Sequence, residues 1–292
     1  MTKKQFMMLF LIPPIIVLAL LSIIPLVEVV GLSFQDFRLR RPDEPTSFVG
    51  LTNFRLLFSD PRFINALQNS LLWQLITVVG SIALALLFAV ILHRRVHGKW
   101  KSLVTLLILT PAVIPRVAAA YQWGLMYSPI LGVLNYFLRV LGFTPVNFLG
   151  DPNIALYAVA FVDIWQWSLL LSVLLLGVID SLPKAPFEAA LMDGAKEWQI
   201  YRHIILPMLT PFLATITLVK MVESLRSFDF IYVMTRGGPG TSTETVDLYA
   251  YLVGMGMSDR ISYASSMSIL MLVVTVLIAT AAWKGYRRWL KE

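Results

Sequence analysis

Six apolar runs, each long enough for a helix to cross a bilayer, constrain the fold of this chain more than any other feature. They cover about residues 6–30, 68–92, 103–127, 154–180, 207–227 and 262–283. About 20 apolar residues are needed for a helix to cross the hydrocarbon core, and none of the runs shows the strict alternation of a barrel strand. Because lipid offers no hydrogen-bond partners to the backbone, each run is predicted to be helical. The sequence predicts an all-α integral membrane protein with six transmembrane helices in a single domain, residues 1–292.

Composition supports this class and excludes others. Hydrophobic residues make up 58% of the chain and charged residues only 14%, which is outside the range of soluble globular proteins. The chain has no cysteine, so a disulfide framework and a thiol nucleophile are excluded. The net charge of +7 is explained by basic residues that flank the apolar runs, and no nucleic-acid partner is expected.

The distribution of lysine and arginine predicts the orientation in the membrane. Thirteen of them lie at the two ends and in loops 93–102 and 181–206, against eight on the other side of the predicted spans. Loop 93–101 is almost wholly basic. Residues 128–153, by contrast, contain a single basic residue, Arg139. Because cytoplasmic loops are enriched in basic residues, both termini and the segment around residues 183–207 are predicted to be cytoplasmic.

That cytoplasmic segment contains the polar stretch EAALMDGAKEWQIYRHIILP, Glu188–Pro207, between two apolar runs. An apolar stripe at helical spacing predicts one buried helix face, made of Phe187, Leu191, Ala195, Trp198 and Ile205. Gly194 permits a sharp change of direction, and the small residues beside it allow another backbone to come close. Two interpretations stay open: docking on a protein partner, or an amphipathic helix on lipid, which would normally carry basic residues along its polar face.

The same stretch resembles the EAA loop of binding-protein-dependent ABC importer permeases. The pattern E-A-A, three residues, G, nine residues, I-x-L-P is matched at Glu188, Ala189, Ala190, Gly194, Ile204, Leu206 and Pro207. Two further stretches resemble the carbohydrate branch of that family, which handles maltose, other sugars, polyols and glycerol phosphate: FVGLTNFRLLFSDPRFINALQNSLLW (48–73) and RSFDFIYVMTRGGPGTSTETVDLYAY (226–251). The resemblance covers essentially the whole chain, which has six predicted spans and lacks the extra spans of the maltose-type permease.

This resemblance implies a type I ABC importer permease fold in a bacterial inner membrane. The implied partners are a second homologous permease, two cytoplasmic ATPase subunits, a periplasmic solute-binding protein, the lipid bilayer and a sugar or polyol substrate. Residues 183–207 would be a coupling segment held in a groove of the ATPase, with Glu188 paired to a basic residue there. The contact would be lined by Ala189, Ala190, Asp193, Gly194 and Ala195.

The sequence predicts no enzyme activity on this chain. It contains no G-x-x-x-x-G-K-[ST] loop to bind the phosphates of ATP, so ATP and magnesium are expected on the partner ATPase. His93 and His97 are spaced to share a helix face, but a basic flank of a membrane span explains them better than a metal site. No cofactor and no metal are therefore expected on this chain.

Charged residues within the predicted spans are the second candidate site, because charge at that depth is costly and marks a pathway or an internal ion pair. Arg116 and Asp163 lie in mid-span, and charged residues recur every three positions from Lys220 to Asp229. Either these groups hold the spans together, or they line a translocation route. The candidate pathway residues are Trp165, Gln166, Trp167, Lys220, Glu223 and Ser227.

These observations together predict the permease subunit of an ATP-driven importer for a sugar, polyol or glycerol phosphate, forming half of the translocation pathway. An ion-coupled secondary transporter of a small polar solute is the alternative. It would explain the intramembrane charges but leaves the polar segment 183–207 without a role. The exact substrate is not encoded in this chain, because specificity in such systems rests largely with the binding protein.

Overall fold

The computed structural model describes residues 3–38, 46–256 and 259–289, with side chains described over 6–38, 46–256 and 259–287. Some basic residues used to predict the orientation lie outside the described side chains: Lys3, Lys4, Arg40, Arg41, Arg288 and Lys291. The chain forms two compact units, Met1–Ile64 with Tyr249–Val274, and Asn65–Leu248 with Thr275–Glu292. The single transmembrane domain stays a prediction.

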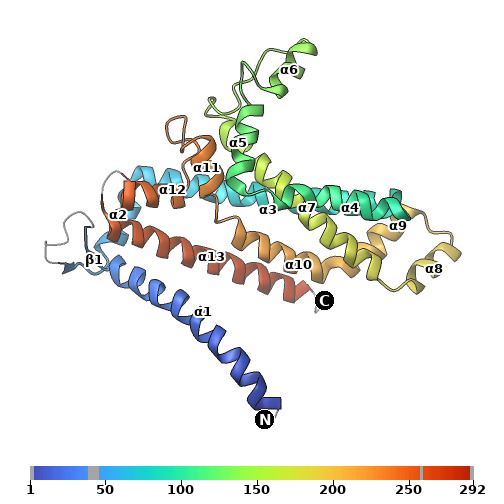
Figure 1. Ribbon diagram of the computed structural model, residues 1–292, viewed down its shortest axis with the longest axis horizontal. Helices are drawn as coiled ribbons and strands as arrows, with labels where there is room; N and C mark the ends of the chain where they lie inside the picture. Colours follow the sequence, from blue (N-terminus) through green and yellow to red (C-terminus); the bar gives the residue numbers. More distant parts are fainter. Residues whose placement is uncertain (1–2, 39–45, 257–258, 290–292) are drawn as a thin grey trace. The chain divides into compact units, whose positions relative to one another are not determined.

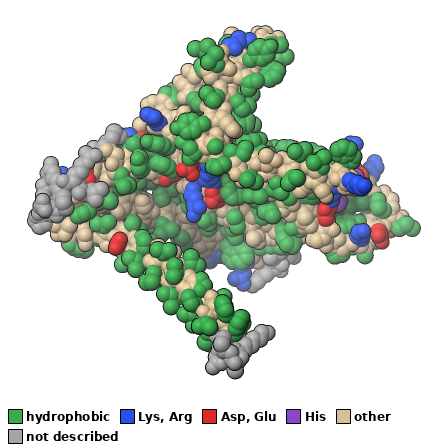
Figure 2. Space-filling view, in the orientation of Figure 1, with side chains coloured by type: hydrophobic (Ala, Val, Ile, Leu, Met, Phe, Trp, Pro, Cys, Tyr) green, Lys and Arg blue, Asp and Glu red, His purple; other side chains and the backbone are tan. Residues whose placement is uncertain are grey.

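The first unit combines the long helix α1 and the first part of a second long helix, α13, with several short elements. Its elements are α1 (Lys3–Ser33), β1 (Gln35–Asp36) paired antiparallel with β2 (Ser47–Phe48), α2 (Thr52–Ser59), the π-helical turn Leu252–Gly256 and the first part of α13 (Ile261–Trp289). The Phe6–Ser33 part of α1 has no buried residues in its most apolar window, and Figure 2 shows hydrophobic side chains along its visible face. Such a surface is suited to contact with lipid or another membrane helix.

Asp60 organises the polar part of this first unit. Its carboxylate accepts hydrogen bonds from the backbone N–H groups of Arg62 and Phe63, which caps the first turn of α3 (Pro61–Arg95). The hydroxyl groups of Tyr249 and Tyr263 also donate to it, at 2.7 and 2.8 Å. Burial alone would raise the pKa of Asp60, but these four hydrogen bonds hold the pKa below its ordinary value. One carboxylate therefore joins the start of α3 to α12 and α13.

The second unit contains most of the helices and all the candidate site residues. Besides most of α3, its elements are α4 (Lys99–Val113), α5 (Arg116–Met126), α6 (Val133–Val140), α7 (Ala155–Ser181), α8 (Ala185–Met192), α9 (Glu197–Ile200), the π-helical turn η1 (Tyr201–Ile205), α10 (Leu206–Glu223), α11 (Phe228–Met234) and the first half of α12 (Val246–Tyr251). In Figure 1, α4 and α7 run side by side, and α8 and α9 lie near their ends.

The helices confirm the all-α membrane class. Among the described residues, five helical stretches are long and apolar enough to span a membrane: Phe6–Ser33, Pro61–Arg95, Ala155–Ser181, Glu197–Glu223 and Ile261–Arg287. A sixth span is obtained if α4 and α5 are counted as one, although they meet at an angle of 94°. The prediction of a continuous third span over 103–127 is therefore wrong in its geometry. The fifth span also ends earlier than predicted, at Glu223 rather than at residue 227.

Proline explains the break in the third span. Pro115 has no N–H to donate to the preceding turn, and the residue before a proline is disfavoured in the α region. Ile114 accordingly adopts an extended backbone with φ −70° and ψ 126°. The side-chain amide of Gln166 on α7 donates to the carbonyl oxygens of Pro111 and Ile114, at 3.0 and 2.7 Å. A broken helix is tolerated at membrane depth only where its freed backbone groups find such partners.

The apolar core of the second unit joins α3, α7 and the helices that follow the polar segment. Its buried members are Ala85, Ala89, Leu171, Leu175, Ile179, Ile200, Ile205 and Leu209. Further along, α3 and α7 approach closely at Gly80, where a Cβ atom would lie 2.6 Å from Ile164 Cδ1. Glycine and alanine on α3 allow this close packing, as small residues commonly do between membrane helices.

Candidate functional site

The EAA stretch forms two short helices joined by a glycine turn. Gly194, just after α8, has φ +77°, a conformation that residues with a Cβ rarely adopt. The N–H of Ala195 donates to the carbonyl of Ala190 at 2.9 Å, and the N–H of Gly194 donates to that of Leu191 at 3.1 Å. This pair of bonds is the Schellman ending of a helix, which satisfies the last carbonyl groups of α8. The predicted change of direction at Gly194 is therefore present.

The turn at Gly194 divides the apolar stripe of Phe187, Leu191, Ala195, Trp198 and Ile205, which was predicted to lie on one helix face. Phe187 and Ala195 are half-buried and pack against the core, and Ile205 is buried within it. Leu191 and Trp198, however, are 59% and 58% exposed. The prediction of one continuous buried face is wrong, because α8 and α9 point their side chains in directions set by the turn.

The polar residues of the stretch lie at the surface of the second unit. Glu188, Ala189, Asp193 and Gly194 are exposed, whereas Ala190 and Ala195 are half-buried against the core. Pro186 occupies the first turn of α8, where a missing N–H costs no hydrogen bond. The exposed side chains of α8 thus include the carboxylate of Glu188 beside the small Ala189, together with Leu191 and Met192, on a helix whose other face is attached to the unit.

A network of ion pairs missed in the sequence connects the basic loop 93–101 to its surroundings. Asp180, at the end of α7, accepts from Lys101 Nζ at 2.5 Å and lies 2.9 Å from His93 Nδ1. Arg94 pairs with Glu197 at the start of α9. His93, treated in the sequence as part of a basic flank, therefore contacts a carboxylate 87 residues away. Sequence spacing carries no signal for such long-range pairs.

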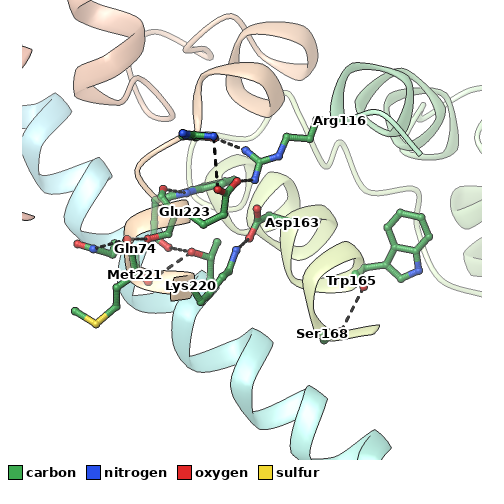
Figure 3. A network of polar contacts seen from close by, with 12 residues as sticks. Gln74, Arg116, Asp163, Trp165, Ser168, Lys220, Met221 and Glu223 are labelled. Carbon is green, nitrogen blue, oxygen red and sulfur yellow. Dashed lines mark hydrogen bonds and ion pairs between the residues drawn. The ribbon is translucent and has the colours of Figure 1, made fainter. Parts of the chain in front are cut away.

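Two buried groups of opposite charge, Asp163 and Lys220, form the centre of the intramembrane charge cluster. Lys220 Nζ donates to Asp163 Oδ2 at 2.5 Å, and the side chains are 0% and 3% exposed. The same ammonium lies 4.9 Å from the ring centre of Trp167. Figure 3 shows the pair reaching from α10 to α7. Removing one member of such a pair leaves an uncompensated buried charge, which costs roughly 3–5 kcal/mol.

A second ion pair crosses the break in the third span. Arg116, the first residue of α5, pairs with Glu223 at the end of α10 and donates through Nη1 to the carbonyl of Arg226 at 2.7 Å (Figure 3). Arg226 Nη1 lies 4.0 Å from Glu223 Oε2, with a side chain that is 78% exposed. The ion-pair interpretation of Arg116 and Asp163 thus describes both residues in this structure.

The structure brings together some of the candidate pathway residues and separates others. Trp167, Lys220 and Glu223 lie in or beside the two ion pairs just described, and Gln166 binds the backbone of the break. Trp165 contacts Trp123, edge to face, with 5.3 Å between ring centres. A cavity of about 270 Å³ is lined by Gln166, Trp167 and Arg116 together with the residues of the break.

Ser227 belongs to a different polar group, beyond α10. Its hydroxyl donates to the carboxylate of Asp247 at 2.9 Å, and the hydroxyl of Thr245 donates to the same carboxylate at 2.5 Å. Burial raises the pKa of Asp247 above its ordinary value, although these hydrogen bonds oppose the shift. Asp247 was not predicted as a site residue, because a carboxylate a few residues after a glycine-rich turn is normally exposed.

The GGPG sequence at 237–240 lies in the turn between α11 and α12. Gly237 and Gly240 both have positive φ, +88° and +60°. The side-chain amides of Asn65 and Asn69 on α3 donate to the carbonyl of Thr241, at 2.8 and 3.0 Å. This turn is therefore held to the second unit by side-chain bonds from α3.

Comparisons with known proteins place this geometry in a family. Residues 81–286 match the model of the family described as binding-protein-dependent transport system inner membrane component. The chain is 36% identical to a probable ABC transporter permease protein of Pyrococcus horikoshii, covering 97% of this chain and 96% of that protein. It is 31% identical to the trehalose/maltose transport system permease protein MalF of Thermococcus litoralis, covering 92% and 91%.

A solved structure has the same fold along almost the whole chain. It is the crystal structure of a bacterial ABC transporter involved in the import of the acidic polysaccharide alginate, with a TM-score of 0.83 and 25% identity over 98% of this chain and 96% of that chain. The chain therefore belongs to the binding-protein-dependent ABC transporter permeases, multi-pass inner-membrane components that leave ATP hydrolysis to a partner ATPase.

Proposed function

We propose that this chain forms half of the translocation pathway of a carbohydrate importer and receives the force of ATP hydrolysis through α8. The observation that carries the proposal is the geometry of α8: its outer face is exposed and carries Glu188, while Phe187 and Ala190 attach its inner face to the core of three membrane helices. A push on α8 would therefore reach α3, α7 and α10 through packed side chains. In this arrangement α8 lies on the cytoplasmic side, as the basic loops indicate.

The exposed side chains of the segment favour a protein partner over lipid. A helix that lies on a bilayer surface normally carries basic residues along its polar face. The polar residues of α8 and its turn, Glu188 and Asp193, are instead acidic, and the small side chain of Ala189 between them allows close approach. A groove on the ATPase with a basic residue opposite Glu188 would fit this face. Ala190 and Ala195 would support the contact from behind.

The carbohydrate class is supported by the relatives. Besides the trehalose/maltose permease, the chain is 30% identical to a sulfoquinovosyl glycerol transport system permease protein of Agrobacterium fabrum and 29% identical to a lactose transport system permease protein of Rhizobium radiobacter. These names share a sugar or sugar derivative. We extend this class, and not any one of its substrates, to this chain. A second homologous permease would complete the pathway, and a periplasmic binding protein would deliver the substrate.

Among the candidate pathway residues, exposure separates two roles. Trp165, Trp167 and Glu223 are partly exposed and are proposed to face the substrate, because aromatic rings and carboxylates suit sugar faces and hydroxyl groups. Lys220, Gln166 and Ser227 are buried and hydrogen-bonded within the unit. They are proposed to position the others rather than contact substrate.

The test of the coupling role is the substitution Glu188→Lys in the complete transporter. If a basic residue of the ATPase faces Glu188, like charges would meet, and losing a desolvated pair at an interface costs roughly 2–5 kcal/mol. We expect binding-protein-stimulated ATP hydrolysis and transport to fall at least tenfold, with partial recovery when the ATPase carries the opposite charge reversal. Lys99→Glu, a charge reversal of an exposed lysine in the basic loop, is the matched control. Full stimulated hydrolysis by Glu188→Lys would refute the role given to this residue.

A further inference from the structure

A cavity of about 560 Å³ lies between α8 and the ends of α3, α7 and η1, and the proposed coupling contact does not use it. Its apolar wall is formed by Ile179, Leu182, Phe187, Leu191, Ile200 and Ile205. Its polar rim is formed by His93, Asp180, Lys184, Glu197 and Tyr201. An apolar wall with a polar rim is the lining expected for an amphipathic ligand.

The cavity lies where three candidate membrane spans end or begin. These spans are Pro61–Arg95, Ala155–Ser181 and Glu197–Glu223. Figure 2 shows Lys, Arg, Asp and Glu side chains gathered at the end of this unit that carries α8 and α9. A ligand in the cavity would have its apolar part level with the ends of the spans and its polar part among these charges.

The acidic residues on the rim already have partners, whereas two donors do not. Asp180 is bound by His93 and Lys101, and Glu197 by Arg94. Across the described residues, by contrast, Lys184 makes no ion pair and the Tyr201 hydroxyl makes no hydrogen bond. What the cavity offers a ligand is therefore an ammonium and a phenol, which suit an anionic head that accepts hydrogen bonds.

Positively charged side chains also lie near the rim residues in the sequence. Exposed basic side chains are sequence neighbours of the rim residues: Arg95 lies two positions after His93, Lys196 directly precedes Glu197, and Arg202 directly follows Tyr201. The guanidinium of Arg94 lies 5.7 Å from the ring centre of Tyr201. The acidic residues of the α8 segment, Glu188 and Asp193, do not line the cavity. The field at the rim therefore favours an anion.

We propose that this cavity binds an anionic phospholipid of the surrounding bilayer. Its acyl chain would pack against Leu182, Phe187 and Leu191, and its phosphate would accept hydrogen bonds from Lys184 and Tyr201. Basic pockets between membrane helices at a cytoplasmic surface are recognised sites for anionic head groups. The bilayer supplies this amphipathic anion at high local concentration, whereas a free phosphate has no apolar part to fill the wall.

Charge also separates this site from the proposed ATPase contact. The outer face of α8 carries Glu188 and suits a basic partner, whereas the rim has paired carboxylates and the ammonium of Lys184, which makes no ion pair among the described residues and would repel such a partner. A lipid behind α8 would fill the space beside the packed contact of Phe187 and Ala190, and would so add to the contact through which a push on α8 moves the spans. This consequence rests on the proposed coupling function, but binding of the lipid does not.

The binding test uses the intact transporter complex, stripped of lipid in detergent and titrated with dioleoyl phosphatidylglycerol or dioleoyl phosphatidylcholine. Native mass spectrometry counts the lipids retained. We expect a preference for the anionic lipid, which Lys184→Ala weakens roughly fivefold, as expected for one lysine at an anionic surface. Leu182→Trp, which fills the cavity, should remove one bound lipid per copy of this chain. Lys99→Ala removes an exposed lysine outside the lining and should bind as the parent does.

Two results would overturn the proposal. The first is equal retention of both lipids, or unchanged retention by Lys184→Ala and Leu182→Trp. The second is loss of the ATPase from the Leu182→Trp complex in lipid-free detergent, which would show that the ATPase itself enters the cavity. Lys184 is exposed, so Lys184→Ala keeps the test valid if the tryptophan variant fails to fold. The outcome is independent of Glu188→Lys, which tests coupling and should leave lipid retention unchanged.

Discussion

The amide of Gln166 donates to the carbonyl oxygen of Ile114 at 2.7 Å, across the gap between α7 and the broken third span. A second bond from the same nitrogen reaches Pro111 at 3.0 Å. Two carbonyl groups released by the break at Pro115 are thus satisfied by one buried side chain. Gln166, which the sequence offered as a sugar-binding candidate, therefore has a structural role.

Gln166→Leu should destabilise the protein, because it removes a donor from the carbonyl oxygen of Ile114, whereas the carbonyl of Pro111 still accepts the N–H of Ile114 at 3.3 Å. Leaving a buried polar group unpaired costs about 1–3 kcal/mol. We expect a lower midpoint of thermal unfolding in detergent. Gln122→Leu, the same change at an exposed position on α5, is the control and should have little effect. An unchanged midpoint in Gln166→Leu would show that the break is stabilised by other groups.

Lys220→Met should impair folding severely, because Asp163 would remain charged and buried without its partner. The expected cost is roughly 3–5 kcal/mol, whereas replacing both members of a buried pair by apolar residues is often tolerated. The double variant Lys220→Met with Asp163→Leu should therefore recover much of the folded protein, measured as monodisperse complex in detergent. Transport by the recovered double variant would show that the pair positions the helices. Normal folding of the single variant would contradict the pairing.

Gly194→Val should disrupt coupling through the backbone rather than through crowding. Apart from its two chain neighbours, a Cβ at this position would meet none of the described residues within 4 Å, but φ is +77°, which is especially unfavourable for a β-branched residue. We expect reduced stimulated ATP hydrolysis with normal substrate release from the binding protein to the complex. Gly194→Asn is the matched variant, because asparagine is tolerated at such helix ends, and it should retain most activity. Equal loss in both variants would argue against the Schellman turn as the cause.

Membrane topology can be tested directly, because the chain has no native cysteine to interfere with labelling. Single cysteines at His97 and Met192 should be protected from an impermeant thiol reagent added outside intact cells. One at Leu131, between α5 and α6, should react. All three side chains are exposed in the second unit, so protection reports the side of the membrane and not burial. Reaction at Met192 from outside would place α8 away from the ATPase.

The elements that depend on local pattern could be predicted from the residues alone. Hydrophobic run length predicted the spans, since crossing lipid requires a minimum length of apolar helix whatever surrounds it. The EAA pattern located the segment around Glu188, and Gly194 marked its turn, because a positive φ is a property of one residue. The 94° bend at Pro115 could also have been predicted from a single residue, the proline itself. Hydropathy, however, is averaged over a window of residues, so one proline hardly changes its value.

Which charges meet depends on how the helices pack in space. Asp163 and Lys220 lie 57 residues apart, and Arg116 and Glu223 lie 107 apart. The sequence showed that these groups were costly in lipid, which left both an ion pair and a transport route open. The packing of α5, α7 and α10 brings Arg116 to Glu223 and Lys220 to Asp163, so that these groups form ion pairs. Energies of long-range pairing depend on distance and burial in space, and neither quantity is present in the order of residues along a chain.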